Sequence, residues 1–461
     1  MSHEIVETQP CSAASSVSEQ MVSVLSHLLT LAAGQQDACP KRGRGRPPSF
    51  SLEHLWLAVL VGMLTQVEGL RRIWRGMVSG PLGSFPMLAV TYEAVRSRLL
   101  AAGSAPLQHF FVQMREALRL WAQQQQLSAW PLASFAPEVV ALDETSLDEL
   151  KRLTADLREV PDKDAHLRPG KLAGLFDLRH QQWLRLQFRA EVPAGCNVGI
   201  WSLLAGLARG SLILEDLGYF SFPWFDYLTE CGYDGISRVK AKTSSTVQQV
   251  FYQDVTCGVL DALVWLGADR ADRAAYAVRL VQYQYQGIRY QYFTNVLDPA
   301  QLPLLEIAQL YARRWDIELA STPRKREVGL ALWWGASPEL VLIQLWLARV
   351  LAQVLHALQL AVAKPAGVEP FEVSMQLLVE QLAFSRAQGR PLMNLLVERG
   401  RFLGLIRPRS RRQVQVPALK PECICSRFEG APPPRLASSA QRNGHGPRQP
   451  FHPRFTSHFL L

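Results

Sequence analysis

Two short apolar runs, each leading into an aspartate, constrain the fold of this chain more than any other feature of its sequence. Val139–Leu142 comes directly before Asp143, and Leu212–Leu214 lies just before Asp216. Apolar runs of this length, rich in Val, Ile and Leu and bounded by polar residues, predict buried strands. Helical patterns separate and follow these runs, so the sequence predicts an α/β fold. An aspartate after a strand is commonly a turn residue or a helix N-cap, and neither position alone indicates chemistry.

A second pattern lies further along the chain, where Tyr311, Arg314, Glu318 and Lys325 are separated by three, four and seven residues. On a helix that turns by about 100° per residue, the four side chains project within an arc of roughly 60°. A carboxylate among cations on one face suits a metal ion surrounded by phosphates. A solvated helix face with i,i+4 ion pairs would contain the same residue types, and the spacing alone does not distinguish the two.

The spacing Tyr-x2-Arg-x3-Glu-x6-Lys is the signature of DDE transposases of the insertion-sequence-4 type, and this chain resembles that family. The resemblance extends from Asp143 to Lys325 and includes residues beside both aspartates. These flanking residues are Thr145 after the first aspartate, and Gly218, Tyr219 and Phe220 after the second. A further match is Thr294-Asn295 in FTNVLD, before the helix that carries Glu318.

The resemblance implies an RNase H-like catalytic core in which Asp143, Asp216 and Glu318 are the catalytic metal ligands. They would hold two Mg²⁺ (or Mn²⁺) ions, with Asp143 bridging both. The residue chemistry agrees, because phosphodiester transfer uses paired divalent ions and Mg²⁺ prefers oxygen ligands. No His/Cys cluster with zinc spacing occurs in the predicted core.

The resemblance also implies residues that bind DNA. Arg314 and Lys325 would grip phosphates beside the scissile bond, and Tyr311 and Tyr219 would contact the nucleic acid. Pro323 departs from the pattern, because proline interrupts a helix and would turn Lys325 away from the face that carries Glu318. The chain differs from the family pattern at two further positions, each directly after an aspartate: Glu144 replaces the usual Gly, and Leu217 replaces the usual Arg.

A basic segment, KRGRGRPPSF at 41–50, precedes the first predicted helix. Its Arg44-Gly45-Arg46-Pro47 core resembles an AT-hook, in which arginines on an extended backbone enter a narrow minor groove. A basic linker that touches phosphates without specificity is the competing interpretation.

Charge and cysteine content agree with a DNA-binding protein of a reducing compartment. The 461 residues carry a net charge of +9, with eleven Lys/Arg against two Asp/Glu in 400–461. Such a balance favours polyanionic partners. The seven cysteines are odd in number and scattered, so they predict no disulfide framework. Polar residues interrupt the longest apolar stretch, Leu340–Ala363, which indicates a buried helix and no membrane span.

Composition and periodicity divide the chain into five segments, and the resemblance implies the DNA-binding and catalytic roles of the second and third. Residues 1–40 are a variable N-terminal segment, 41–135 a helical DNA-binding domain, 136–363 the catalytic domain with a β-rich insertion at 241–298, 364–415 a helical C-terminal region, and 416–461 a basic disordered tail. Apolar periodicity predicts helices at 52–64, 69–77, 91–100, 107–126, 199–208 and 223–230. It predicts strands at 171–177, 182–188, 235–239, 247–252, 258–265, 277–283 and 287–292.

Together these features predict a DNA transposase that cleaves DNA and transfers strands with divalent metal. The expected partners are double-stranded DNA (transposon ends and target) and a second copy of the chain, without a membrane, in a cytoplasmic, nucleoid-associated location. Two alternatives remain open: a decayed, catalytically inactive DNA-binding protein, and an RNase H-like nuclease.

Overall fold

The computed structural model describes residues 50–64, 67, 69–80, 86–124, 127, 131–146, 171–189, 200–267, 270, 273–321, 334, 337–388, 392–407 and 415–435. The predictions for Arg44, Arg46, Pro323 and Lys325 lie outside these residues. The chain divides into two compact units: unit 1 is Met1–Ala117 with Ala336–Arg407, and unit 2 is Leu118–Gly335 with Pro408–Leu461.

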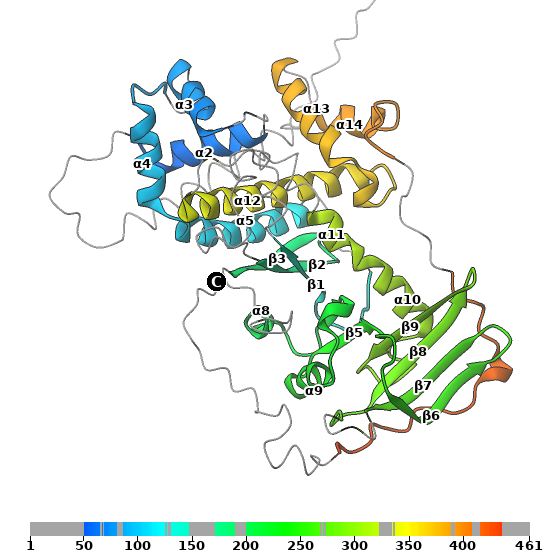
Figure 1. Cartoon of the computed structure of the whole chain (residues 1–461). Coiled ribbons are helices and arrows are strands. Elements are labelled where there is room, and N and C mark those ends of the chain that lie inside the picture. Colours follow the sequence, from blue (N-terminus) through cyan, green and yellow to red (C-terminus); the bar gives the residue numbers. More distant parts are fainter. Residues whose placement is uncertain are drawn as a thin grey trace, which may run out of the picture. The chain divides into compact units, whose positions relative to one another are not determined.

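Unit 1 is helical throughout its described residues, apart from short turns and an isolated bridge between Val373 and Ile406. Its helices are α2 (Leu52–Leu64), α3 (Leu70–Ser79), α4 (Tyr92–Ala102), the first part of α5 (Ala105–Gln124), α12 (Pro338–Ala363), α13 (Met375–Gln388) and α14 (Leu392–Arg399) (Figure 1). The predicted helices at 52–64, 69–77, 91–100 and 107–126 are confirmed to within a few residues. Thr91 caps α4 by accepting a hydrogen bond from the Ala94 amide at 3.2 Å, which fixes the start of that helix.

Helix α12 is the central helix of unit 1. It is long and apolar enough to cross a membrane by length and composition, but 89% of its most apolar window is buried inside the protein. Its apolar residues pack against both α2 and α13. Because α12 has helices on more than one side, apolar side chains are found around its circumference and not on one face only. The sequence had placed this helix in the catalytic domain, and here it belongs to unit 1 because its packing partners are the N- and C-terminal helices.

Unit 2 is built on one nine-stranded sheet with the order β3-β2-β1-β4-β5-β9-β8-β7-β6. Its strands are β1 (Val139–Ser146), β2 (Lys171–Asp177), β3 (Gln182–Arg189), β4 (Leu212–Glu215), β5 (Asp234–Arg238), β6 (Ser245–Asp254), β7 (Val259–Leu266), β8 (Val278–Tyr285) and β9 (Ile288–Thr294). All nine predicted strands are present, so the mixed α/β expectation is confirmed.

Strands β1, β4 and β5 are parallel, whereas β2 lies between β1 and β3 and is antiparallel to both. In register, Leu142 lies beside Glu215 and Glu215 beside Ser237. The carboxyl ends of β4 and β5 therefore meet at one edge of the sheet, next to the part of β1 that carries Asp143. Parallel strands buried on both faces are nearly continuous apolar runs, as Val139–Leu142 and Leu212–Leu214 are.

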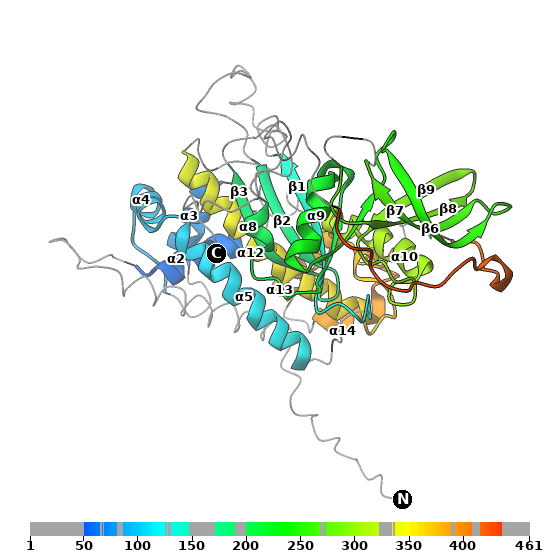
Figure 2. The same ribbon diagram turned by 90° about the horizontal axis from the view of Figure 1, so that it is seen from below.

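The predicted insertion forms the other half of the sheet. Strands β6 to β9 are antiparallel neighbours (Figure 2), and β9 joins the parallel half through its pairing with β5 (Figure 1). Arg279 on β8 and Asp261 on β7 form an ion pair at 2.6 Å inside this region, and the Arg279 side chain is 0% exposed. Arg279 also donates to the carbonyl of Leu302 at 2.7 Å, which ties the insertion to the loop before α10 (Leu304–Arg313).

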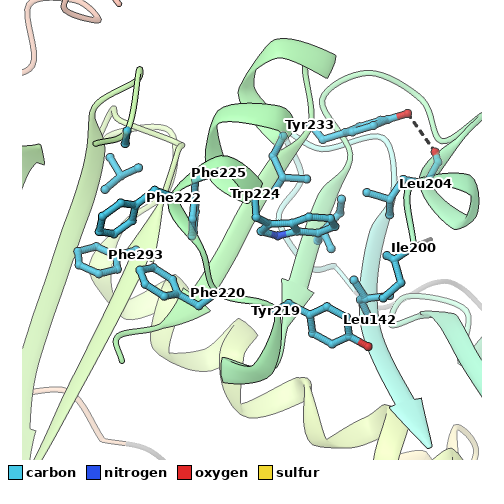
Figure 3. Packing of buried hydrophobic residues seen from close by; sticks show 14 of the residues in the cluster. Leu142, Ile200, Leu204, Tyr219, Phe220, Phe222, Trp224, Phe225, Tyr233 and Phe293 are labelled. Carbon is cyan, nitrogen blue, oxygen red and sulfur yellow. Dashed lines mark hydrogen bonds between the residues drawn. The ribbon is translucent and has the colours of Figure 1, made fainter. Parts of the chain in front are cut away.

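Three short helices pack beside the parallel half: α8 (Trp201–Leu204), α9 (Phe222–Cys231) and the 3₁₀ helix η2 (Leu217–Tyr219). The predicted helix at 199–208 is thus much shorter than expected, because the chain turns at Ala205 and Gly206. Aromatic side chains form the core here, with Phe220 stacked on Phe293 at a centroid distance of 5.5 Å (Figure 3). This packing fixes the loop that follows Asp216.

The expectation of a disordered tail from residue 416 is wrong for residues 416–435, which lie along β6 and include a 3₁₀ turn, η5 (Pro421–Cys423). Ile424 forms an antiparallel bridge with Tyr252, and the Cys425 amide donates to the carbonyl of Phe251 at 2.8 Å. The Arg435 guanidinium lies 3.9 Å from the ring centroid of Trp265. As an edge strand, β6 offers backbone N–H and C=O groups that hydrogen-bond to this C-terminal segment. These contacts hold the segment in place although its sequence has little apolar periodicity.

Candidate active site

The three predicted acidic residues come from three elements of unit 2. Asp143 lies within β1, which continues to Ser146 and so extends beyond the predicted end of the strand. Asp216 follows β4 directly, and Glu318 lies on α11 (Trp315–Ser321), which packs against β1. The fold thus directs residues far apart in sequence to one edge of the sheet.

Arg314 joins two of these acids. Its Nη2 atom lies 2.8 Å from Oε1 of Glu318 and 3.7 Å from Oδ1 of Asp216. The Arg314 side chain is 6% exposed, against 35% for Glu318 and 47% for Asp216. A buried guanidinium therefore holds the two more exposed carboxylates close together, and both carboxylates keep a solvent-facing side.

Asp143 is the most buried of the three acids. Burial, together with the charges of Glu318 and Asp216, raises the pKa of Asp143 to about 6. A hydrogen bond from the Glu144 amide at 2.8 Å and the charge of Arg314 act in the opposite direction. The three carboxylates and the guanidinium thus form one electrostatic group, in which a bound cation would favour the ionised form of Asp143.

The helix that was expected to carry the signature residues is divided at Arg314. Helix α10 ends at Arg313 and α11 begins at Trp315, while the Arg314 amide donates to the carbonyl of Tyr311 at 3.1 Å. Bonds between residues three apart belong to a tighter, 3₁₀-like turn. Arg314 nevertheless stays beside Tyr311 and Glu318, because its backbone remains in the right-handed helical region.

Tyr311 and Tyr219, which the sequence assigned to DNA contacts, are both buried. The Tyr311 hydroxyl donates to the carbonyl of Glu215 at 3.2 Å, and its ring packs on Tyr292 at a centroid distance of 4.8 Å. Tyr219 is 2% exposed and belongs to the hydrophobic core around Trp224. In this arrangement Tyr311 joins α10 to the end of β4, immediately before Asp216.

Asp316 anchors the start of α11 and was not singled out by its sequence. It is 0% exposed, and its Oδ2 atom lies 3.3 Å from Nη1 of Arg313 and 3.2 Å from Nε2 of Gln181. Gln181 sits in the turn between β2 and β3 with a φ of 56°. This contact connects the β2–β3 turn to the helix that presents Glu318, and no sequence pattern would have paired the two.

Glu215 is a fourth acid next to the site, and it faces the core. It is 0% exposed, accepts a hydrogen bond from the Trp224 indole, and its burial raises its pKa to about 8. Its Oε1 atom has no hydrogen-bond partner among the described residues. Glu215 is therefore protonated at neutral pH. The sequence did show an acid directly before Asp216, but strand alternation turns it to the opposite face.

Glutamine at position 215 is expected to stabilise the protein at pH 7 by on the order of 3 kcal/mol and to have little effect at pH 4. The folded pKa of about 8 lies above the unfolded value of 4.5, so the folded chain keeps a proton that the unfolded chain releases. Stability from this group is complete below pH 4.5 and falls as the pH rises toward 8. Urea unfolding of wild type and Glu215→Gln at both pH values would measure it, with Glu230→Gln on the exposed side of α9 as control. Equal stabilities at pH 7 would contradict a buried, protonated Glu215.

The structure thus brings together Asp143, Asp216, Glu318, Arg314 and Tyr311. Within the described ranges, no group of three His, Cys, Asp or Glu side chains is close enough to hold a metal ion. The guanidinium of Arg314 lies between two of the three carboxylates.

Residues 135–326 match the family model of the transposase DDE domain, a range that contains all three acids. The match supports a DDE-type transposase. Among solved structures, the chain is similar to the piggyBac transposase synaptic complex with hairpin DNA, at 8% identity and a TM-score of 0.38, over 87% of this chain and 85% of that chain. A similarity at this score does not establish a shared fold. No curated protein matched the sequence.

Proposed function

We propose that this chain is a metal-dependent DNA transposase of the DDE type, related to the insertion-sequence-4 transposases, that cleaves DNA and transfers its strands. The observation that carries the proposal is the electrostatic coupling of Asp143, Asp216 and Glu318 inside the range that matches the transposase DDE domain. The Tyr311, Arg314 and Glu318 spacing supports the narrower assignment.

The strand order supports an RNase H-like core. Strand β2 is antiparallel to both of its neighbours, β3 and β1, and β4 and β5 follow parallel to β1. This is the order expected of such a core, with an acid on the first strand and another after the fourth. The strands β6 to β9 are then an insertion before the helix that carries Glu318.

As placed in this structure, the three described carboxylates are not grouped to hold a metal ion. Their chemistry nevertheless fits Mg²⁺ or Mn²⁺, because all three are oxygen donors, and burial and the acidic neighbours raise the pKa of Asp143. Asp143, Asp216 and Glu318 would hold the ions. The chemistry that such ions supply when bound is activation of a water or 3′-hydroxyl and stabilisation of charge on the leaving oxygen.

The other residues of the site have positioning and binding roles. Arg314 keeps Glu318 and Asp216 together and stabilises their charges, and Tyr311 fixes α10 against the end of β4. Lys325 would bind phosphate, and Arg44 and Arg46 would contact the backbone or minor groove of DNA.

The proposed partners are double-stranded DNA, as transposon ends and as target, and a second copy of the chain in the active complex. A cytoplasmic, nucleoid-associated location would suit these partners.

One observation favours a second candidate, a transposase-derived DNA-binding protein without catalysis. Arg314 occupies a place between Asp216 and Glu318, and Leu217 brings no charge to the adjacent turn. In that case the carboxylates would form a structural ion pair with Arg314, and DNA binding would not depend on divalent metal.

A nicking assay distinguishes the two candidates. The full chain is incubated with supercoiled plasmid that carries the inverted repeats flanking its coding region, with Mg²⁺, Mn²⁺ or EDTA. Metal-dependent nicks at the repeat ends, and joined products, are expected of the transposase. Binding to the repeats without cleavage in either metal would overturn catalysis and favour the binding protein, whereas cleavage without end specificity or joining would favour a nuclease.

A further inference from the structure

Three cations gather where β5 ends, beside the candidate active site. Ser237 lies in register with Glu215, so Arg238 follows on β5 at the same level as Asp216 on the neighbouring chain segment. Neighbouring strands lie roughly 4.8 Å apart. Lys240 and Lys242 follow in the segment between β5 and β6. Arg238, Lys240 and Lys242 are all exposed.

No carboxylate among the described residues pairs with these three cations. Within the described part of the chain, neither Arg238, Lys240 nor Lys242 forms an ion pair with an acid, whereas Arg314 contacts both Asp216 and Glu318. A cation that already forms an ion pair contributes less binding free energy to an incoming phosphate, because the existing pair must be weakened first. The unpaired cations are therefore better suited to bind a polyanion than Arg314 is.

Lys240 also lies against the loop that follows Asp216. Its Nζ atom donates to the carbonyl of Phe220 at 3.3 Å, directly after the η2 turn. Leu217 in that turn is uncharged, and the ammonium of Lys240 supplies positive charge at the same place. The Phe220 ring is held in the core by Phe293, so this attachment point is rigid (Figure 3).

Arg238 is electrostatically part of the same site. Burial raises the pKa of Tyr311 above its usual range, and the charges of Arg314, Asp216 and Arg238 all act on that hydroxyl. Arg238 is also opposite Tyr292, whose ring packs on Tyr311. Arg238 thus lies at the rim of the site, outside the buried Tyr292–Tyr311 contact.

We propose that Arg238, Lys240 and Lys242 form a phosphate-binding row that holds the DNA backbone next to the reacting bond. The inference rests on the proposed function and adds a DNA contact surface that the signature residues do not include. A row of solvated turn residues without a ligand is the alternative, and it predicts no effect on DNA affinity.

The test measures DNA binding in EDTA, where no cleavage can occur, across a series of salt concentrations. The variant Arg238→Gln/Lys240→Gln/Lys242→Asn removes three charges, and asparagine tolerates the φ of 66° at position 242. We expect a loss of affinity of at least about tenfold and a salt dependence that is shallower by roughly two to three in log–log slope. Lys240→Arg, which keeps the charge, should bind like wild type.

The matched control is Arg209→Gln. Arg209 is exposed, lies before β4 at the opposite end of the parallel strands, and is expected to leave affinity and slope unchanged. A triple variant with wild-type melting temperature, affinity and slope would overturn the phosphate row alone. A wild-type chain that neither binds nor nicks DNA would overturn the proposed function together with this inference. If wild type does nick DNA, a triple variant that behaves like wild type counts against the phosphate row only.

Discussion

Replacing Asp143 with asparagine is expected to reduce metal-dependent nicking by more than about 100-fold, beyond the 10- to 100-fold typical of outer-shell partners. Asparagine still offers an oxygen to the Glu144 amide, so the bond at 2.8 Å can persist and the fold is maintained. What is lost is one of three negative charges that would hold the divalent ions. DNA binding in EDTA should be retained or strengthened, because a repulsive charge leaves the DNA surface.

The measurement compares nicking rates in Mg²⁺ and Mn²⁺ with binding of the same repeat DNA. Glu144→Gln is the matched control, since Glu144 is the next residue on β1 and pairs with Lys171 on β2. It should lose no more than a few-fold in rate. Nicking at the wild-type rate by Asp143→Asn would show that this carboxylate is not a catalytic ligand and would remove the central support of the proposed chemistry.

The largest expected effect on stability comes from Asp261. Asp261→Ala leaves the guanidinium of Arg279, whose side chain is 0% exposed, without its charge partner. Removing one member of a buried pair typically costs about 3–5 kcal/mol. We expect a loss of that size in the free energy of unfolding, with accompanying loss of nicking, because Arg279 also holds the Leu302 carbonyl before α10.

Urea or thermal unfolding of the full chain would measure this loss. The double variant Asp261→Leu/Arg279→Met is the control, because it removes both charges and fills the space with apolar atoms. It should recover most of the stability. A single variant as stable as wild type would mean that the pair is not buried as the structure shows, and an unstable double variant would place the stabilising role in the backbone contact to Leu302.

Strand positions were largely predictable because each depends on local pattern. The run Lys171–Asp177 was predicted with its observed bounds, and the runs ending near Asp143 and Asp216 are apolar enough to indicate buried strands without knowledge of their neighbours. The closeness of Tyr311, Arg314 and Glu318 was likewise predictable from their spacing, since a helical turn brings residues three and four positions apart together.

The contacts that organise the site were not predictable from pattern. Asp316 meets Gln181 across 135 positions of the chain, and neither residue stands in a recognisable motif. The order of residues 415–435 depends on the free edge of β6. The row of Arg238, Lys240 and Lys242 lies near Asp216 only because β5 pairs with β4, and the sequence does not show that pairing. Arg314 was expected to face phosphates, whereas here it contacts two carboxylates.

The amino-acid sequence by itself determined which segments become strands and most of the helices, because apolar periodicity and local backbone preference act over a few residues. Only the tertiary structure decided that Glu215 points into the core, that Arg314 bridges Asp216 and Glu318, and that cations without an acidic partner among the described residues lie beside them. Those outcomes depend on strand register, burial and charges from distant segments, which act through space between residues that the linear order leaves far apart.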